Sequence, residues 1–369
     1  MPDTFIRSAT PGDREGLVAL LDRCFPERDF AERFDERYPH LFTDAAIVQH
    51  LLAFQDGRLL ACVGCYAYDA RWFGAPLRVA GIGQVATDPA ARGGGVMSRL
   101  LRTAVERARQ VDFFWLWGDR QRYGRIGFAS GGRTLSGGTW DRYLPDPGTG
   151  AGIRPLDREA DAELIARVLG NLPFAIELTS HERSAMLRGM GAVGWTDGSA
   201  CILGDRGGAR IWATLGSGAA VERLLGWHAR AGAAEGRPDG RLEVLADPGD
   251  EDAVSLVRRT AGTFSEQPTA SIRVGRLRPM LAAWAAAHPV RGLRLPPFCL
   301  DGGAAGRVSI SCASGIWRID DCDGTPDLGL AGQELSELLV GFVPAPSPVG
   351  GALGALLPMR LSIPPCYAL

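Results

Sequence analysis

Lysine is missing from this chain. All 40 basic residues among its 369 residues are arginine. Pyridoxal enzymes form a Schiff base with a lysine amine, and P-loop kinases bind nucleotide phosphates with a lysine side chain. The sequence therefore predicts neither kind of enzyme.

Side chains that bind metal ions are few and dispersed. The chain has eight cysteines and five histidines, and the one close pair, Cys62 and Cys65, has no second pair at the spacing of a zinc site. In the strand-like run LLACVGCYAY, residues three apart point to opposite faces of a sheet. We expect both cysteines to pack in the core, and the sequence predicts no metal site.

Long apolar runs and excess charge are also lacking. No apolar stretch reaches the length of a membrane span, and the start MPDTFIRSATPGDRE lacks the apolar core of a signal peptide. The formal net charge is −2 and 46% of the residues are hydrophobic, so nothing attracts the chain in bulk to nucleic acid or to an anionic membrane. We expect a cytoplasmic globular protein that binds neither.

The N-terminal part of the chain predicts a mixed α/β (α+β) fold. FIRSATPGDREGLVALLDRCF predicts a strand followed by an amphipathic helix, and Asp56-Gly57 joins two strand-like runs as a hairpin. A third strand, from about Leu77 to Thr87, precedes a glycine-rich turn. An amphipathic helix of about four turns begins at Val96, and the run DFFWLW after it predicts a buried strand.

Changes in composition divide the chain into three predicted domains. Residues 144–152 are rich in Pro and Gly and are typical of a linker between a first domain, 1–143, and a second, 153–270. The pattern of predicted helices and strands changes again after about residue 270. Residues 271–369 predict a small α+β domain with two helices and a hairpin.

The second domain is predicted to repeat the first in degenerate form. Ile153 and Arg154 match Ile6 and Arg7, and the match continues at one constant offset into the following helix. The later segment RLEVLADPGDEDAVSLVRR resembles GQVATDPAARGGGVMSRLL, with carboxylates in place of arginine and glycines. Carboxylates at a helix start repel a phosphate, so only the first copy is expected to hold an anion.

The turn before Val96 has the composition of an anion site. Three glycines, residues 93–95, follow Arg92 and lead directly into the helix. Unpaired backbone N–H groups at a helix start bind anions, and an arginine can grip phosphate oxygens with two donors. The turn therefore predicts phosphate binding, whereas the same glycines without Arg92 would indicate only a flexible loop.

A dinucleotide site is the competing interpretation of this region. Gly81, Gly83 and Ala86 spell G-x-G-x-x-A after a strand, but that fingerprint requires the helix to begin among its glycines. Pro89 disfavours helical geometry at Asp88, so strand or turn continues to about Thr87. We interpret the match as coincidental. An NAD-dependent dehydrogenase is therefore only the third functional hypothesis for this chain.

The residues from Arg92 to Met97 resemble the acyl-CoA motif of the GNAT acetyltransferase superfamily, Arg/Gln-x-x-Gly-x-Gly/Ala, with Met97 in place of the last small residue. The segment YGRIGF, residues 123–128, is similar to the superfamily's Tyr-x-Lys-x-Gly-Phe segment. Together with the degenerate second copy and the α+β tail, these features resemble the Eis-type (enhanced intracellular survival) N-acetyltransferases. Residues 77–128 alone carry specific motifs.

This resemblance implies a fold, a co-substrate and an assembly. It implies tandem GNAT-like domains with a central mixed sheet, a sterol-carrier-like C-terminal domain, acetyl-CoA as co-substrate and a homo-oligomer, a hexamer in that family. The coenzyme would lay its pyrophosphate on the turn and its pantetheine arm along the strand edge. The predicted cofactor-binding residues are Val85, Ala86, Thr87, Arg92, Gly93, Gly94, Gly95, Val96, Met97 and Ser98.

The resemblance also implies two catalytic groups. Tyr123 would protonate the departing thiolate, since a tyrosine pKa of about 10 lies above the ~8.5 of a thiol. The C-terminal carboxylate, here that of Leu369, would act as the base on the attacking amine. From the residues alone, Tyr123 and the apolar tail LSIPPCYAL could equally pack in the core.

The acceptor is predicted to be an amine, either a cationic small molecule such as an aminoglycoside or polyamine, or a lysine side chain. Phe30 and Phe34 stand four residues apart among Asp29, Glu32, Asp35 and Glu36, which predicts either an acidic, aromatic wall for a cation or a solvated helix face. Trp72, Trp115 and Trp117 line a pocket or fill the core. The alternative function is a non-enzymatic binding protein with a vestigial coenzyme site.

Overall fold

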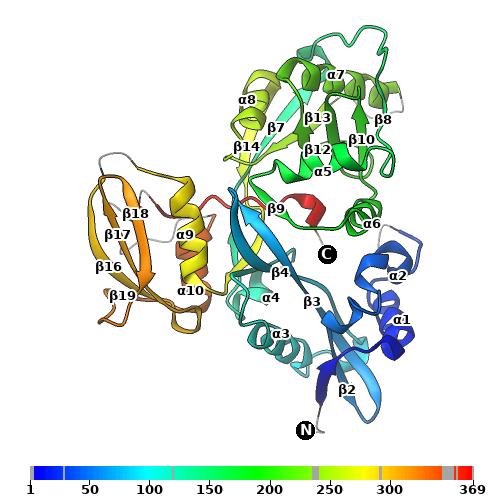
Figure 1. The fold of residues 1–369 in the computed structure, drawn as a ribbon. Coiled ribbons are helices and arrows are strands. Elements are labelled where there is room, and N and C mark those ends of the chain that lie inside the picture. Colours follow the sequence, from blue (N-terminus) through cyan, green and yellow to red (C-terminus); the bar gives the residue numbers. More distant parts are fainter. Residues whose placement is uncertain are drawn as a thin grey trace. The chain divides into compact units, whose positions relative to one another are not determined.

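The computed structural model describes residues 4–27, 30–118, 120–234, 241–290, 293–342, 353–354 and 356–367. These residues form two compact units (Figure 1). The first contains the described parts of 1–131 and 270–359, and the second contains those of 132–269 and 360–367.

A mixed sheet in the order β1-β2-β3-β4-β5-β15-β6 forms the centre of the first unit. β4 and β5 run parallel, and the other neighbours run antiparallel. Its elements are β1 (Phe5–Ser8), α1 (Arg14–Cys24), α2 (Phe34–Arg37), β2 (His50–Gln55), β3 (Arg58–Trp72), β4 (Ala75–Thr87), α3 (Val96–Arg107), β5 (Phe113–Leu116), α4 (Arg120–Gly124), β6 (Ala129–Gly131) and β15 (Ala270–Val274). The mixed fold predicted from the sequence is confirmed, as is the hairpin, whose turn residues Asp56 and Gly57 both have positive φ, 50° and 76°.

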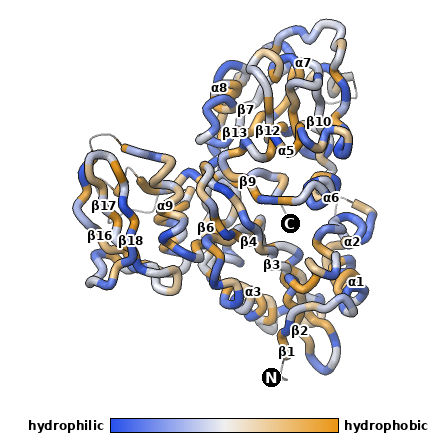
Figure 2. Tube along the Cα trace, viewed as in Figure 1, coloured by the Kyte–Doolittle hydropathy of each residue, from blue (hydrophilic) through white to orange (hydrophobic). Residues whose placement is uncertain are grey.

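Two helices cover opposite faces of this sheet. The buried residues of α3 pack with Leu51 of β2 and Val63 of β3, whereas those of α1 pack with the neighbouring Leu52 and Cys62. This is the alternation that a strand imposes on successive side chains. Along the tube in Figure 2, hydrophobic positions alternate with hydrophilic ones on both helices. The sheet is therefore buried on both sides.

The two neighbouring cysteines lie as the strand pattern predicts. Cys62 packs on the α1 face and Cys65 against the α3 face of the sheet. Burial raises the pKa of the Cys65 thiol to about 12, so both remain protonated apolar side chains. The core role of this pair is confirmed.

The second unit contains another mixed sheet, in the order β14-β7-β13-β12-β11-β10-β8. β12 and β13 are its parallel pair. The elements of this unit are β7 (Thr134–Trp140), β8 (Arg154–Pro155), α5 (Ala162–Gly170), β9 (Phe174–Ile176), α6 (Ser180–Met190), β10 (Val193–Thr196), β11 (Cys201–Gly204), β12 (Arg210–Leu215), α7 (Gly218–Ala234), β13 (Arg241–Ala246), α8 (Glu251–Thr260) and β14 (Ala261–Gln267), of which β9 is not a strand of this sheet. Strand, helix, meander, helix and parallel strand follow one another in the same order as in the first unit.

Each sheet takes one strand from the other half of the sequence. β6 belongs to the first sheet, but β7 directly after it pairs with β13 and β14 of the second. In return, β15 follows β14 and lies between β5 and β6 of the first sheet. The chain therefore crosses between the units at Gly131/Gly132, upstream of the segment 144–152 that composition marks as a linker, and again at Thr269/Ala270.

A third, smaller sheet lies in the first unit, in the order β18-β17-β16-β19. Its part of the chain comprises α9 (Leu277–Ala287), β16 (Leu295–Asp301), β17 (Arg307–Ala313), β18 (Ile316–Asp321), β19 (Leu328–Gly329) and α10 (Gly332–Val340). The predicted helices and hairpin of this region are all present. Trp284 of α9 stacks on Trp72 of β3, with ring centroids 5.3 Å apart.

The sequence comparison of RLEVLADPGDEDAVSLVRR with the glycine turn is wrong. That segment forms β13 and α8, and β13 is the parallel neighbour of β12 as β5 is of β4. The counterpart of the turn before α3 is therefore the connection from β12 to α7, residues 216–217. Both segments contain an Asp-Pro pair, and this short match suggested that they were equivalent. Equivalence depends instead on strand order, which is set by pairing between distant segments.

Candidate functional site

The end of β4 is bent by a β-bulge. Cys62 pairs with Ala86 and Gly64 with Gly83, so two residues of β4, Gln84 and Val85, oppose the single Val63. Gln84 has a φ of 50°. Such an extra residue twists a strand and redirects the residues after it, here Val85 to Thr87.

A buried polar cluster fixes the bulge. The side-chain Oε1 of Gln84 lies 2.8 Å from His50 Nε2, and the Tyr66 hydroxyl lies 2.8 Å from the same nitrogen. His50 Nδ1 contacts the Ile47 carbonyl oxygen at 3.0 Å. Burial lowers the pKa of His50, so the ring is neutral near pH 7. A neutral ring carries one N–H, so it donates to only one of the Ile47 and Gln84 oxygens, and the Gln84 side chain packs beside His50 within this cluster.

Beyond the bulge, one edge of β4 is open. β5 pairs with β4 only at Val79 to Gly81, whereas β3 accompanies β4 to Thr87. Among the described residues, no strand therefore pairs with Val85 to Thr87 on the β5 side. Backbone donors and acceptors on that side are available to an extended ligand.

The turn from β4 to α3 is shaped by glycine and anchored by Asp88. Gly93 and Gly95 have φ of 86° and 71°, a region that residues with a Cβ rarely enter. Asp88 accepts a hydrogen bond from Ala90 N at 3.0 Å and pairs with Arg58 at 2.9 Å, and these contacts lower the pKa of its carboxyl. Gly95 begins α3 without a side-chain cap, so the first N–H groups of the helix point outward unpaired by a side chain.

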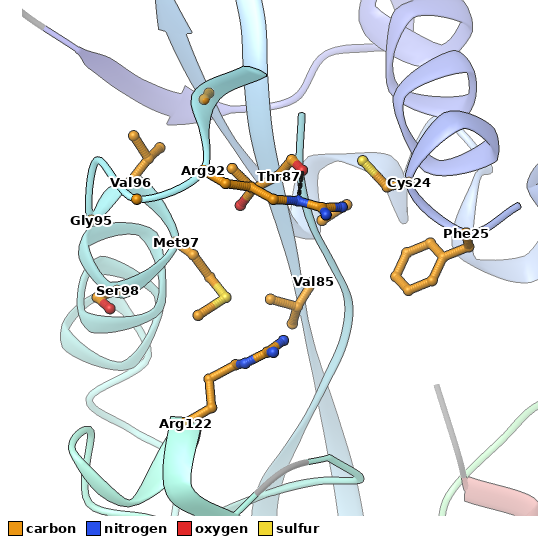
Figure 3. Close-up of a pocket in the computed structure, with 13 residues that line it drawn as sticks. Cys24, Phe25, Val85, Thr87, Arg92, Gly95, Val96, Met97, Ser98 and Arg122 are labelled. Carbon is orange, nitrogen blue, oxygen red and sulfur yellow. Dashed lines mark hydrogen bonds between the residues drawn. The ribbon is translucent and has the colours of Figure 1, made fainter. Parts of the chain in front are cut away.

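These elements line a pocket of about 630 Å³ (Figure 3). Its walls contain nine of the ten predicted cofactor-binding residues, all except Gly94, together with residues that the sequence did not indicate. The predicted residues in the wall are Val85, Ala86, Thr87, Arg92, Gly93, Gly95, Val96, Met97 and Ser98; the added residues are Cys24, Phe25, Ala91 and Arg122.

Two arginines give the pocket its charge. Arg92 donates from Nε to the Thr87 carbonyl at 3.4 Å, and Arg122 extends from α4 toward Val85 and Met97 (Figure 3). Among the described residues, no carboxylate forms an ion pair with either of them. The sequence missed Arg122 because its signal was the neighbouring Tyr123, and it missed Cys24 and Phe25 because they end a different helix.

Tyr123 is not part of the pocket wall. It is 7% exposed and packs in the core of the first unit, with its ring centroid 6.3 Å from that of Phe128. A Cβ on Gly118 would lie 2.5 Å from the Tyr123 ring, so this glycine provides the room for the ring. Tyr123 directly follows the pocket residue Arg122, and its catalytic role stays a prediction.

Leu369, the other predicted catalytic residue, lies outside the described residues. The last described segment of the tail packs within the second unit. Tyr367 is buried there, and its hydroxyl accepts a hydrogen bond from Ile176 N at 3.2 Å. Burial raises the pKa values of Cys366 and Tyr367. The tail is thus an ordered part of the core as far as Tyr367.

The predicted acidic and aromatic wall takes a different form. Helix α2 begins at Phe34, so Phe30 precedes it, and the two rings pack edge to face 5.4 Å apart. Arg33 forms an ion pair with Asp35 at 3.1 Å, and Glu36 accepts a hydrogen bond from Arg33 N. The charges meet arginine or backbone N–H groups rather than an open cleft; Asp29 lies outside the described residues.

The remaining candidate residues divide between core and surface. Trp72 and Trp115 are fully buried, and Trp117 is 39% exposed. No group of three or more His, Cys, Asp or Glu side chains within the described ranges could hold a metal ion. No helix in the described part of the chain is both long and apolar enough to cross a membrane.

Several solved structures share this fold at low sequence identity. A GCN5-related N-acetyltransferase from Kribbella flavida is 18% identical with a TM-score of 0.65, and covers 91% of this chain and 88% of its own. A probable N-acyltransferase from Enterococcus faecalis V583 is 14% identical, with a TM-score of 0.68 and coverage of 91% and 90%. Eis1 from Mycobacterium abscessus is 16% identical, with a TM-score of 0.59 and coverage of 90% and 88%.

Sequence comparison is more restricted. No curated protein matches the chain. Residues 5–131, which contain the pocket, match the model of the acetyltransferase (GNAT) domain. The chain thus contains a GNAT acetyltransferase domain at residues 5–131, and this domain supports acyltransferase activity.

Proposed function

We propose that the chain transfers the acetyl group of acetyl-CoA to an amine at the pocket beside the β4–α3 turn. The observation that carries this proposal is the convergence on one cavity of an uncapped helix start, an open strand edge and two arginines that form no ion pair with any carboxylate of the described residues. The pyrophosphate of the coenzyme would meet Arg92 and the N–H groups at the start of α3. The amides of the pantetheine arm would bond to the free edge of Val85 to Thr87, as an added strand does.

The chemistry requires a proton to leave the amine and another to reach the sulfur. The neutral amine attacks the thioester carbon, and the collapse of the intermediate breaks the carbon–sulfur bond and releases a thiolate. Tyr123 would protonate that thiolate, and the C-terminal carboxylate of Leu369 would accept the proton from the amine. The burial of Tyr123 supports a positioned hydroxyl, because its ring is fixed by Phe128 and Gly118.

We further propose that the chain is an Eis-type N-acetyltransferase, whose acceptor is an aminoglycoside or polyamine, or a lysine side chain. The tandem mixed sheets and the third sheet packed on α9 support this proposal, as does the 90% coverage by the Eis1 fold. By the same resemblance, the C-terminal part would be a sterol-carrier-like domain and the assembly a hexamer.

The reaction is tested by thiol release from acetyl-CoA with an aminoglycoside, a polyamine and a lysine peptide. We expect release that depends on at least one amine, and its absence with all three classes would overturn the proposed reaction. Tyr123→Phe keeps the ring packing and should lower kcat about 100-fold with little change in the KM for acetyl-CoA. Tyr143→Phe removes a hydroxyl from a half-exposed tyrosine and should leave kcat unchanged. An unchanged kcat in Tyr123→Phe would remove Tyr123 from the mechanism.

The base is tested at the C-terminus. Deletion of Leu369 moves the terminal carboxylate by one residue and should lower kcat, whereas Leu369→Ala retains that carboxylate and should keep most of the activity. Equal activity of the two variants would exclude the carboxylate as the base and leave the rest of the proposal standing.

A further inference from the structure

A second cavity, of about 280 Å³, lies beside the same two helices as the coenzyme pocket. Its walls come from α3, from the loop after α4, and from β15 and α10. The residues are Arg102, Val105, Glu106, Gly124, Arg125, Ile126, Gly127, Arg273, Gly332 and Gln333. Residues 124–127 belong to the YGRIGF segment of the sequence, but that motif did not indicate a second cavity.

The two cavities follow one another along α3 and α4. Ser98 lines the coenzyme pocket and Arg102 the second cavity, four residues later on the same helix face, a step of about 6 Å at 1.5 Å per residue. Arg122 and Arg125 stand in the same relation three residues apart. A ligand that leaves the first pocket along these helices would therefore meet the second cavity within one helical turn.

The second cavity is strongly basic. Arg102 and Arg125 form no ion pair with a carboxylate in the described part of the chain, and both are exposed to solvent. Arg273 forms the deeper wall and donates from Nε to the Ile126 carbonyl at 2.9 Å. Three arginines and one carboxylate residue, Glu106, thus line the cavity, and this balance of charge favours an anion with more than one charge.

Glycines keep the basic wall close to the loop. A Cβ on Gly127 would lie 2.9 Å from Arg273 Nε, and one on Gly124 would lie 2.8 Å from Gln333 Oε1. Side chains at these positions would push Arg273 and Gln333 away from the loop. The cavity is therefore a site built by several elements, and not a gap between flexible surface residues.

We propose that this cavity binds the 3′-phosphate of the coenzyme, so that the enzyme selects acetyl-CoA over acetyl-3′-dephospho-CoA. The inference rests on the proposed function, because it begins from the pyrophosphate at Arg92 and the start of α3. In the coenzyme, one ribose separates the diphosphate from the 3′-phosphate, and in the protein one helical turn separates Ser98 from Arg102. The 3′-phosphate is a dianion that Arg102 and Arg125 can bind with charge-assisted hydrogen bonds.

The test compares the two donors on the intact chain. KM and kcat are measured for acetyl-CoA and for acetyl-3′-dephospho-CoA, and the Kd values of CoA and 3′-dephospho-CoA are measured by calorimetry. We expect the absence of the 3′-phosphate to raise KM and Kd about 10- to 100-fold, as for the loss of hydrogen bonds to a charged group. We expect kcat to stay within about twofold, because the phosphate is remote from the thioester.

Variants test whether the preference for acetyl-CoA over acetyl-3′-dephospho-CoA comes from the second cavity. Arg102→Ala and Arg125→Ala should weaken acetyl-CoA binding and leave acetyl-3′-dephospho-CoA binding unchanged, so the preference disappears. Arg107→Ala is the matched control, since it removes the same charge from an exposed position of α3 outside both cavities. It should preserve the preference.

The outcomes separate this inference from the function on which it rests. If both donors bind and react equally well in the wild type, the 3′-phosphate proposal is overturned and the acetyl transfer stands. The proposal is also overturned if Arg102→Ala and Arg125→Ala weaken both donors equally. If neither coenzyme binds, the proposed function itself fails.

Discussion

The two mixed sheets lead into their crossover helices through connections of very different kinds. In the first unit, β4 reaches α3 through residues 88–95, with Arg92 and two left-handed glycines. In the second unit, β12 reaches α7 through Gly216 and Ser217 alone. The parallel strand after each helix is in the same place. The difference shows that the sheet order does not require the glycine-rich turn, because the order is the same in the second unit, which lacks that turn between β12 and α7.

The starts of α3 and α7 also differ in whether the nearby arginine is paired with a carboxylate. A Cβ on Gly218 would lie 2.8 Å from Arg259 Nη2, so Arg259 covers the start of α7. Glu222 pairs with Arg259 at 2.9 Å and neutralises it. In the first unit, Arg92 bonds only to a backbone carbonyl among the described residues. An arginine near a helix start therefore indicates an anion site only when no carboxylate of the fold has already paired with it.

Other features are common to both units. Arg7 forms two hydrogen bonds with Asp13 before α1, and Arg154 forms two with Asp161 before α5. These pairs fix the entry of the first helix in each half. They support the duplication that the sequence matches around Arg7 and Arg154 predict.

The largest effect is expected from Gly95→Val. A β-branched residue is strained at the φ of 71° that Gly95 adopts, and the shifted N–H groups would no longer converge on the pyrophosphate. We expect the Kd of acetyl-CoA to rise roughly 100-fold, measured by calorimetry. Gly207→Val places similar strain, at φ 82° with open space around it, in a turn of the second unit. If both variants bind acetyl-CoA as tightly as the wild type does, the left-handed glycine of the β4–α3 turn is not needed for coenzyme binding.

Arg92→Ala should have the next largest effect. The loss of charge-assisted hydrogen bonds to the pyrophosphate is expected to raise the KM for acetyl-CoA about 20-fold. Arg259→Ala removes an arginine of α8 that lies beside the start of α7, the corresponding helix of the second unit. It should leave that KM unchanged, because Arg259 is already paired with Glu222. Steady-state kinetics of the two variants check this, and an equal rise in both would contradict the assignment of the anion to the first unit alone.

The smallest effect tests the likeness of the units. Arg7 lowers the pKa of Asp13, and Arg154 lowers that of Asp161. A depressed carboxyl pKa stabilises the fold above the unfolded value of about 3.9, and this contribution is lost as the pH falls through the folded value. Asp13→Asn and Asp161→Asn should each lower the free energy of unfolding by about 1 kcal/mol at pH 7.

Urea denaturation at several pH values checks this expectation. The difference between each variant and the wild type should shrink steadily below pH 4, as the wild-type carboxyl becomes protonated in both states. A difference that stays constant down to pH 2 would mean that the carboxylate charge does not stabilise these helix starts.

Much of the candidate site could be predicted from the sequence, because its geometry is local. Glycines beside Arg92 determine the shape and charge of the turn, and nine of the ten predicted residues line one pocket. Arg122, Cys24 and Phe25 could not be predicted in the same way. Cys24 and Phe25 stand at the end of α1 and Arg122 lies on α4, and only the tertiary packing of these helices brings them to the cavity.

By itself, the sequence determined the elements whose hydrogen bonds lie within a few residues: the Asp56-Gly57 hairpin, the helix from Val96 and the glycine turn. The tertiary structure alone decided the exchange of β7 and β15 between the sheets, the open edge at Val85 to Thr87 and the burial of Tyr123. Turn and helix propensities act over a few neighbouring residues. The exchanged strands instead pair with segments more than a hundred residues away, and the open edge depends on where the separate strand β5 stops pairing with β4. Periodicity carries no signal for such pairing.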